Sequence, residues 1–340
     1  MSEPDLSPKV DKPTENVYIA EINLGLEMAQ HCPLCQLSGP FKVFRAVRTP
    51  VRIVMDSTSI YGCCPRCGLV FQLQRLTDKA QVDFYSYVYR PAVSGSAHIT
   101  PHLLVTETVR GWKLWTMLRR WNVSPKRILD VGSSTGAVMR FLRRETGAFV
   151  VGVEANRDFA AYSSTLGTPT WYDLDDVPGQ FDLVIASHLL EHINDPVGFA
   201  ARLAPKMAPG GKLLVEVPNL YSGNALRVPH PIAFSRRTLT MTLEKAGFRI
   251  LGTSVNGKPG IWLYPEYIDA LAEVSDYKIL TWRPSRERWI AQKYDLGRFW
   301  ARICFKLGQL GWMARLTHYH LPSGKELLRA QTDGADPAGH

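Results

Sequence analysis

Long apolar runs are missing from this sequence. None reaches the roughly 18 residues that a membrane-spanning helix needs, although 45% of the 340 residues are hydrophobic. Residues 1–16 hold acids and prolines where a signal peptide would have a basic start and an apolar stretch. Internal repeats and low-complexity tracts are absent as well. We therefore expect a soluble, cytoplasmic protein that is long enough for one α/β domain and accessory structure.

Cysteine is scarce, and five of the six cysteines lie between residues 32 and 67. In a reducing compartment such a cluster favours metal binding over disulfide bonds. The segments Cys32-Pro-Leu-Cys35 and Cys64-Pro-Arg-Cys67 are two CxxC knuckles separated by 28 residues, a spacing that can bring four thiolates to one tetrahedral zinc ion. Cys63 stands one residue too early for a tight knuckle, so we interpret it as a bystander. Cys304 is expected to be a buried apolar residue.

Short aliphatic runs alternate with amphipathic stretches between about residues 104 and 265. The runs are Arg127–Val131, Phe149–Val153, Phe181–Ala186 and Lys212–Val217, and the stretches are Val105–Trp121, Ala137–Glu145, Pro196–Met207 and Arg236–Ala246. This alternation predicts right-handed βαβ units in a doubly wound, mainly parallel α/β sheet. The runs Phe248–Val255 and Ile261–Pro265, joined by five residues with two glycines, predict an antiparallel hairpin at the end of the domain.

A glycine-containing loop follows the first predicted strand. The sequence Ile128-Leu-Asp-Val-Gly-Ser-Ser-Thr-Gly136 places Asp130 at the carboxyl end of this strand, where open α/β sheets bind ligands. Gly132 and Gly136 allow a sharp turn close to a ligand, and the next helix offers N–H groups at its start. Alone, the loop is also consistent with a purely structural turn.

The second predicted strand adds an independent feature. Val150-Val-Gly-Val-Glu154 ends in a carboxylate about twenty residues after the loop, where it can accept both hydroxyls of an adenosine ribose. A dinucleotide would share this geometry, but Asp130 would repel its pyrophosphate. S-adenosylmethionine (SAM) carries a sulfonium and an amine, so Asp130 suits SAM.

Together these motifs make residues 104–265 similar to class I SAM-dependent methyltransferases. Phe181–His192 is similar to the family's fourth strand and the turn after it, and Ala208–Asn219 to its fifth strand. The resemblance implies a seven-stranded sheet closed by an antiparallel hairpin. It also implies that Asp130, Gly132, Ser134 and Gly136 line the methionine part of SAM, that Glu154 holds the ribose, and that Asp173 contacts the adenine, with Asp175 as its rival.

Candidate catalytic groups follow the fourth predicted strand. Methyl transfer from a sulfonium is a direct displacement, so the enzyme must align both partners and remove a proton from a hydroxyl acceptor. Histidine titrates in the right range, and His188, Glu191 and His192 lie here. In the sugar and quinone-type O-methyltransferases that this segment resembles, the Glu-His pair lies at the active site. The resemblance implies His192 as the base, with Glu191 orienting it and His230 near the acceptor.

Two alternatives remain at this site. One of these histidines could serve only to cap or pack a helix, and His230 could simply lie on the surface. Some relatives use the Glu-His pair to hold Mg²⁺, but there a further acid often stands where this chain has His188. That departure argues against a metal-dependent mechanism.

The cysteine module resembles the zinc-binding head of bacterial methyltransferases found with sugar and surface-glycan biosynthesis. The likeness lies in Cys64–Phe71, an acid-rich turn and the pair Phe84-Tyr85. It implies a structural Zn²⁺ held by Cys32, Cys35, Cys64 and Cys67, in a module that covers the active-site mouth or shapes the acceptor pocket. A nucleic-acid role for the knuckles lacks a nearby basic patch.

The C-terminal region supplies most of the formal net charge of +9, because residues 278–329 hold eleven Lys or Arg against three acids. Leu296–Leu316 predicts an amphipathic helix, with Arg298, Arg302, Lys306 and Gln309 in one polar stripe. We expect this helix to pack against the catalytic domain. The alternatives are peripheral contact with an anionic membrane through residues 296–316, binding of a phosphate-bearing acceptor, and contact with RNA.

The sequence therefore predicts four parts: a flexible tail (1–25), a zinc-binding module (26–90), a SAM-binding methyltransferase domain (91–265) and a basic helical region (266–340). The leading hypothesis is methyl transfer to a hydroxyl, and in second place to a carbon, of a sugar nucleotide or glycan intermediate. Too few residues follow the hairpin for a second α/β domain, which favours O-methylation. An RNA methyltransferase and a non-catalytic scaffold that binds SAM and zinc are the alternatives, and no feature indicates an oligomeric state.

Overall fold

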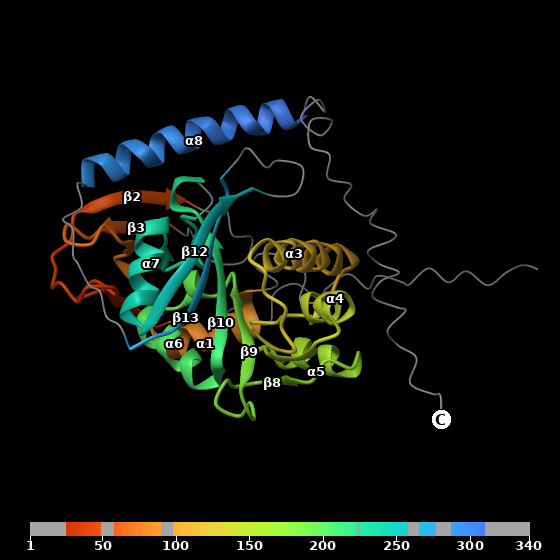
Figure 1. Cartoon of the computed structure of the whole chain (residues 1–340). Coiled ribbons are helices and arrows are strands. Elements are labelled where there is room, and N and C mark those ends of the chain that lie inside the picture. Colours follow the sequence, from red (N-terminus) through yellow and green to blue (C-terminus); the bar gives the residue numbers. More distant parts are fainter. Residues whose placement is uncertain are drawn as a thin grey trace, which may run out of the picture.

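The structure is a computed structural model that describes residues 25–48, 58–89, 98–222, 225–257, 265–276 and 287–309. Its centre is a seven-stranded sheet between layers of helices (Figure 1). In spatial order the strands are β12 (Phe248–Asn256), β13 (Tyr267–Val274), β10 (Met207–Pro218), β9 (Phe181–Ser187), β6 (Arg127–Val131), β7 (Phe149–Val153) and β8 (Thr170–Trp171). The strands from β10 to β8 pair in parallel, whereas β13 is antiparallel to both of its neighbours. The prediction of a doubly wound, mainly parallel α/β fold is confirmed.

The alternation of side chains along the buried strands creates the two helix layers. The helices are α3 (Pro101–Arg120) and α4 (Ala137–Thr146) on one face, and α6 (Pro196–Leu203) and α7 (Arg236–Lys245) on the other. In β6, Ile128 packs in the cluster that contains the apolar side chains of α3 and α4. Its neighbour Leu129 points the other way, into the cluster that contains those of α6 and α7.

Helix α5 (Arg157–Thr165), which connects β7 to β8, was not among the predicted helices. Its start is specified locally, because the side chain of Asn156 accepts a hydrogen bond from the backbone N–H of Phe159. The starts of α6 and α7, which were predicted, are capped in the same way by the side chains of Asp195 and Ser235. These caps place the strand-to-helix turns at the carboxyl edge of the sheet.

The closing hairpin is placed differently from the prediction. The strand predicted at Phe248–Val255 is present as β12, but Pro265 is not in a strand, and residues 261–264 lie outside the described residues. The antiparallel partner is β13, which lies between β12 and β10. Its sequence Tyr-Ile-Asp-Ala-Leu-Ala-Glu-Val carries acids and alanines, so it lacks the β-branched composition that marks a strand. The sheet therefore continues beyond residue 265, where the predicted domain ended.

The cysteine module is built into the catalytic unit. Strands β2 (Val43–Arg48), β3 (Thr58–Cys63) and β4 (Val70–Gln72) form a sheet whose fourth strand is β11 (Ile232–Ala233), supplied by the segment before α7. A second, two-stranded sheet pairs β1 (Leu26–Met28) with β5 (Gln74–Leu76). Helix α1 (Asp78–Asp83) and the π-helix η1 (Phe84–Val88) follow. The head and the catalytic segment before α7 therefore share one sheet.

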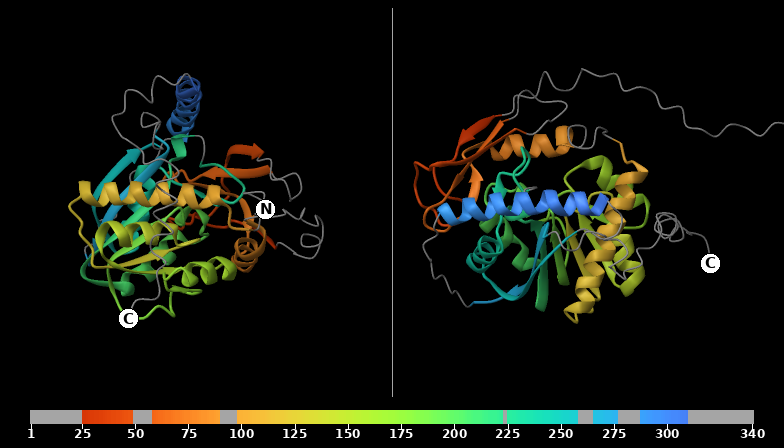
Figure 2. Two further views of the ribbon diagram at one scale, coloured as in Figure 1. Left: turned by 90° about the vertical axis from the view of Figure 1, so that its right-hand side faces the viewer. Right: turned by 90° about the horizontal axis from the view of Figure 1, so that it is seen from above.

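Helix α8 (Glu287–Gln309) lies across the outside of the molecule, beside β2 and the short turn η4 (Leu220–Ser222) (Figures 1 and 2). Tyr294 is its buried anchor and stacks edge-on against Phe44 at a centroid distance of 5.7 Å. An ion pair of 2.5 Å joins Arg45 to Asp295. The helix thus begins earlier than the predicted Leu296, and residues 310–316 lie outside the described residues. Cys304 is buried, as expected. In the described chain no helix is both long and apolar enough to cross a bilayer.

Candidate active site

The predicted site residues gather at the carboxyl edge of the sheet. Asp130 lies near the end of β6, Glu154 directly follows β7, and His188 directly follows β9. Because these strands are parallel, their carboxyl ends meet at one edge. The structure therefore brings the predicted cofactor residues and the predicted catalytic residues to neighbouring positions.

The loop after β6 has a backbone shape that requires its small residues. Gly132, Ser134 and Gly136 have φ values of 83°, 50° and 74°. A Cβ at Gly136 would also collide with the hydroxyl of Ser163. Glu154 ties this loop to β7, since its carboxylate accepts hydrogen bonds from the backbone N–H groups of Ser134 (2.8 Å) and Asn156 (2.9 Å). The loop is thus held in shape by the same carboxylate that is predicted to bind the ribose.

Asp130 is a buried carboxylate with only 3% of its surface exposed. Burial raises its pKa to about 7; Arg110 opposes this rise, and Glu107 and Glu154 add to it. An acid in such a place is stabilised as a carboxylate when a cation arrives. The amine and sulfonium of SAM are such cations, so the residues present fit this cofactor.

Asp173 and Asp175 both lie on the surface after β8, and the structure separates their surroundings. Arg202 lies 2.9 Å from a carboxylate oxygen of Asp175 and 3.5 Å from one of Asp173. The same oxygen of Asp173 accepts a hydrogen bond from the backbone N–H of Asp175. Asp173 thus shapes the turn, while Asp175 is the stronger partner of Arg202.

Glu191 is the centre of the histidine cluster and is 2% exposed. One carboxylate oxygen lies 3.3 Å from Nδ1 of His188 and 3.8 Å from Nε2 of His192. Burial opposes its charge, yet a hydrogen bond from His188 and the nearby His192 and His230 lower the pKa of Glu191 to about 2. The side chain is therefore a carboxylate at neutral pH, poised to stabilise positive charge on an imidazole.

His192 meets a residue that sequence reasoning did not assign to the site, Tyr85 of the π-helix η1. The Tyr85 hydroxyl lies 2.6 Å from Nδ1 of His192 and donates to the carbonyl of Pro229 at 2.6 Å. Nδ1 of His192 is itself 2.8 Å from that carbonyl. When Nδ1 carries the proton and donates to Pro229, the basic lone pair of His192 is on Nε2. The only sequence signal for Tyr85 was that the pair Phe84-Tyr85 belongs to the segment that resembles a zinc-binding head.

His230 completes the cluster from the segment before α7. It is buried, its ring packs edge-on against that of His192 at 4.8 Å, and its Nδ1 is 2.9 Å from the carbonyl of Ala225. Burial and the neighbouring His192 lower the pKa of His230 to about 3, so the ring stays neutral. Its alternative placement on the surface is thus wrong. One potential ligand atom from each of Glu191, His192 and His230 lies within 4.8 Å of the others, so the cluster also has the size of a divalent-cation site.

A second group of buried charges lies behind His188. Lys113 of α3 forms ion pairs with Glu216 of β10 and with Asp269 of β13, and all three side chains are buried. Nε2 of His188 is 3.2 Å from Glu216. Burial alone would raise the pKa of Glu216, but Lys113 and His188 hold it well below its usual range. No sequence pattern indicated this group, because its members come from three distant elements.

The four cysteines of the two knuckles lie together and are buried. Cys32 and Cys67 have their sulfur atoms 3.5 Å apart, and Cys35 and Cys64 have theirs 3.4 Å apart. All four sulfur atoms lie within 4.8 Å of one another. Zn–S bonds of about 2.3 Å at tetrahedral angles place sulfur atoms about 3.8 Å apart. The donor set therefore fits a tetrahedral metal, and Cys63 is not part of it.

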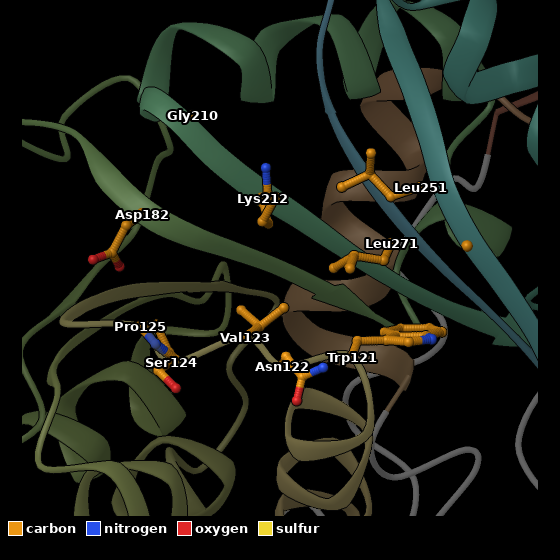
Figure 3. A pocket seen from close by; sticks show the side chains of 11 residues that line it. Trp121, Asn122, Val123, Ser124, Pro125, Asp182, Gly210, Lys212, Leu251 and Leu271 are labelled. Carbon is orange, nitrogen blue, oxygen red and sulfur yellow. The ribbon is translucent and has the colours of Figure 1, made fainter.

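A cavity of about 410 Å³ lies at the opposite edge of the sheet, between Trp121–Pro125, β10 and β12 (Figure 3). Its two charged side chains are engaged elsewhere: Asp182 accepts from the backbone N–H groups of Lys126 and Arg127, and Lys212 pairs with Glu273. It contains none of the predicted site residues. The chemistry therefore belongs to the carboxyl edge.

Comparison with known proteins agrees with this geometry. Residues 112–252 match the family described as a methyltransferase domain. The chain is 28% identical over 160 residues to trans-aconitate 2-methyltransferase of Deinococcus radiodurans, covering 44% of this chain and 58% of that protein. It is 25% identical over 116 residues to a ubiquinone biosynthesis O-methyltransferase of Aeromonas salmonicida, covering 31% and 48%.

Among solved structures, magnesium protoporphyrin IX methyltransferase of Synechocystis PCC 6803 with bound SAH aligns with 59% of this chain and 100% of its own, at 15% identity and a TM-score of 0.44. The chain spans about half the length of the curated relatives that it matches. Residues 112–252 therefore match a methyltransferase domain, and the mainly parallel seven-stranded sheet with its antiparallel strand β13 is the α/β fold expected of one.

Proposed function

We propose that this protein transfers the methyl group of SAM to a hydroxyl of a sugar nucleotide or glycan intermediate, with His192 as the general base. The observation that carries the proposal is the buried carboxylate of Glu191 between His188 and His192, at the same sheet edge as Asp130. A hydroxyl must lose its proton as it attacks a methyl group, and an imidazole beside a carboxylate is suited to take that proton. The sugar-type acceptor rests on the resemblance of the head and of the turn after β9.

The proposed roles of the cofactor residues rest on the family resemblance, and those around His192 on its contacts. Asp130 would hold the amine of SAM, Glu154 its ribose and Asp173 its adenine, with the loop Gly132–Gly136 against the methionine part. SAM supplies an electrophilic methyl group when bound. Nε2 of His192 would accept the acceptor's proton, Glu191 would stabilise the resulting imidazolium, and the Tyr85 and Pro229 contacts would fix the plane of the ring. The proton then leaves to solvent after the product departs.

The head would hold one structural zinc ion through Cys32, Cys35, Cys64 and Cys67, and so shape the acceptor side of the site. The contacts of the head support this role. Tyr61 donates to the carbonyl of His230 at 2.7 Å, and Gln72 donates to that of Val228 at 2.9 Å. A folded head thereby fixes the segment that carries His230. The predicted parts of the chain then act as one enzyme, whose methyltransferase unit extends through β13.

The test is a methyl-transfer assay with isotope-labelled SAM and panels of sugar nucleotides, glycolipid extract and RNA. We expect a sugar-containing product, and a rate about 10²- to 10⁴-fold lower for His192→Ala, because a positioned base contributes that factor. His102→Ala, on the exposed start of α3, is the matched control and should keep the wild-type rate. A His192→Ala enzyme as fast as wild type would exclude this base. A product only with RNA would exclude the acceptor class.

A further inference from the structure

A second cavity lies beside the carboxyl end of β10, at Asn219 and Tyr221, and is not used by the site described above. Its volume is about 630 Å³. Four parts of the chain meet around it: the second knuckle at Gly68, the segment after β10 at Tyr221, the start of α7 at Arg236, and α8 at Trp289. The head, the catalytic sheet and the C-terminal helix thus each contribute one wall.

The walls carry positive charge. Arg236, Arg237 and Lys293 line the cavity, and none of its described lining residues is acidic. The first turn of α7 adds to this, because the N–H groups at a helix start face outward along the axis and favour anions. Ser235, which caps that turn, also lines the cavity. An anion in the cavity would therefore meet two guanidinium groups and one ammonium from two different helices.

The aromatic wall is the second feature. Trp289 is 58% exposed although it lines the cavity, so a flat face of an indole is available beside the cations. Tyr221 also lines the cavity, and the ammonium of Lys293 lies 5.8 Å from the centre of its ring. Indole faces stack on planar rings and on apolar chains alike. The cavity can therefore take a molecule that is anionic at one part and flat or apolar at another.

The chain itself connects this cavity to the catalytic cluster. His230 packs against His192, and five residues later Ser235 lines the cavity. An extended chain covers at most about 3.6 Å per residue, so the Cα atoms of His230 and Ser235 are no more than about 18 Å apart. The catalytic cluster and the cavity are thus joined by a short stretch of chain, from His230 to Ser235.

We infer that this cavity binds the phosphate or diphosphate group of the methyl acceptor. The inference rests on the proposed methyl transfer and narrows its substrate class to acceptors that carry such a group on the same molecule as the methylated hydroxyl. Two arginines and a lysine match phosphate oxygens, because guanidinium groups donate paired hydrogen bonds to them. Trp289 would then contact whatever follows the phosphate, either a nucleoside base or a lipid chain.

The experiment measures binding of inorganic pyrophosphate to the zinc-loaded full chain by calorimetry. We expect binding by the wild type and at least a tenfold weaker affinity for Arg236→Ala/Arg237→Ala/Lys293→Ala. The control, Lys79→Ala/Arg120→Ala/Arg144→Ala, removes the same charge from exposed positions elsewhere and should bind like wild type. Equal affinity of the two triple variants, or no binding by the wild type, would overturn the inference.

Two further arms identify the source of the phosphate. Tighter binding of UDP than of pyrophosphate, reduced by Trp289→Ala, would assign the cavity to a nucleoside diphosphate. Sedimentation with phosphatidic acid vesicles, lost in the cavity variant and kept in the control, would assign it to a phospholipid-type group. Binding of an RNA oligonucleotide that pyrophosphate does not displace would overturn the inference.

Failure of this inference is distinguishable from failure of the proposed function. If SAH binds and turnover depends on His192, while an acceptor with phosphate is methylated with the same KM by both triple variants, the phosphate site is wrong and methyl transfer stands. If an acceptor with phosphate shows a raised KM and an unchanged kcat only in the cavity variant, the cavity binds the acceptor. If SAH does not bind, the proposed methyl transfer from SAM is itself wrong.

Discussion

His192 and His230 pack edge to face, with ring centroids 4.8 Å apart and an interplanar angle of 76°. They come from two separate segments at the carboxyl edge of the catalytic sheet, one after β9 and one before α7. Two neighbouring imidazoles in a buried site cannot easily both carry charge, and the lowered pKa of His230 shows which of them stays neutral. This arrangement supports the proposal that His192, next to Glu191, is the ring that accepts a proton.

Glu191→Gln should slow methyl transfer and shift its pH profile. Removing the carboxylate takes away the charge that favours an imidazolium at His192, so the base weakens. We expect kcat to fall about 10- to 100-fold, since part of the general-base contribution is lost, and the acid limb of the profile to move to lower pH. Rates between pH 5 and 9 check this, with Glu145→Gln on α4 as the control. An unchanged profile would contradict the role of Glu191.

Binding of SAH should release a proton below pH 7 and little above it. Without ligand the pKa of Asp130 is raised to about 7 by burial, so below pH 7 the side chain is mostly protonated. The cationic amine binds the ionised form, so affinity should fall by up to tenfold for each pH unit below 7. Calorimetry at pH 6 and 8, in buffers with different ionisation heats, measures the release. Asp130→Asn should bind weakly with no proton release.

The raised pKa of Asp130 also affects the folding stability of the protein without ligand, and here the favourable pH range is the acidic one. The folded state holds a proton on Asp130 that the unfolded chain releases near pH 4, so this group's stabilising contribution is present below pH 4 and is lost as the pH rises through 7. Denaturation midpoints of Asp130→Asn should therefore vary less with pH between 4 and 7 than those of wild type. Parallel curves would contradict the raised pKa.

Cys64→Ser should remove the metal of the head, while Cys63→Ser should keep it. The two residues are adjacent and buried, but only Cys64 lies within the group of four sulfur atoms. We expect one zinc per chain in wild type and in Cys63→Ser, by elemental analysis, and much less in Cys64→Ser. Because zinc binding is coupled to folding, the thermal transition should also fall. Full zinc content in Cys64→Ser would contradict the four-thiolate site.

Lys113→Met should destabilise the fold strongly. Lys113 is the cation of a buried group that includes Glu216 and Asp269, and its removal leaves carboxylates without a counter-charge. Breaking such a buried pair typically costs about 3–5 kcal/mol. Lys212→Met is the control, because its pair with Glu273 is partly exposed and should be worth about 1 kcal/mol or less. Urea denaturation measures both; similar losses would show that burial of Lys113 is unimportant.

Local sequence signals were sufficient for five strands of the catalytic sheet (β6, β7, β9, β10 and β12), for most helices and for the glycine-containing loop after β6. β6 and β7 are continuous apolar runs, and the turns after them need glycines and a carboxylate at fixed spacing, so each could be recognised from neighbouring residues alone. The CxxC pairs are equally local. Their closeness in space matches the tetrahedral coordination that the spacing suggests.

The missed features depend on contacts between distant segments. β13 has a weak strand composition and is held by pairing on both sides, with Asp269 opposite Glu216. Tyr85 reaches His192 because η1 packs against the catalytic edge; the likeness of the head placed Tyr85 near the active-site mouth, but no sequence pattern indicated its contact with His192. β11 is two residues long and exists only as a partner of β4. In each case tertiary context decided what local propensity left open.

The pairing of β11 with β4 limits how the head of this protein can be replaced in a chimera. Gln72 donates its backbone N–H to the carbonyl of Pro231, and the Tyr61 hydroxyl donates to the carbonyl of His230. Two hydrogen bonds from the head therefore fix the segment that carries His230. A chimera that takes its head from a different methyltransferase would need to import residues 225–235 as well. Replacing the cysteine-containing head would then also replace the segment that carries His230, so the head and the acceptor preference of the enzyme would change together.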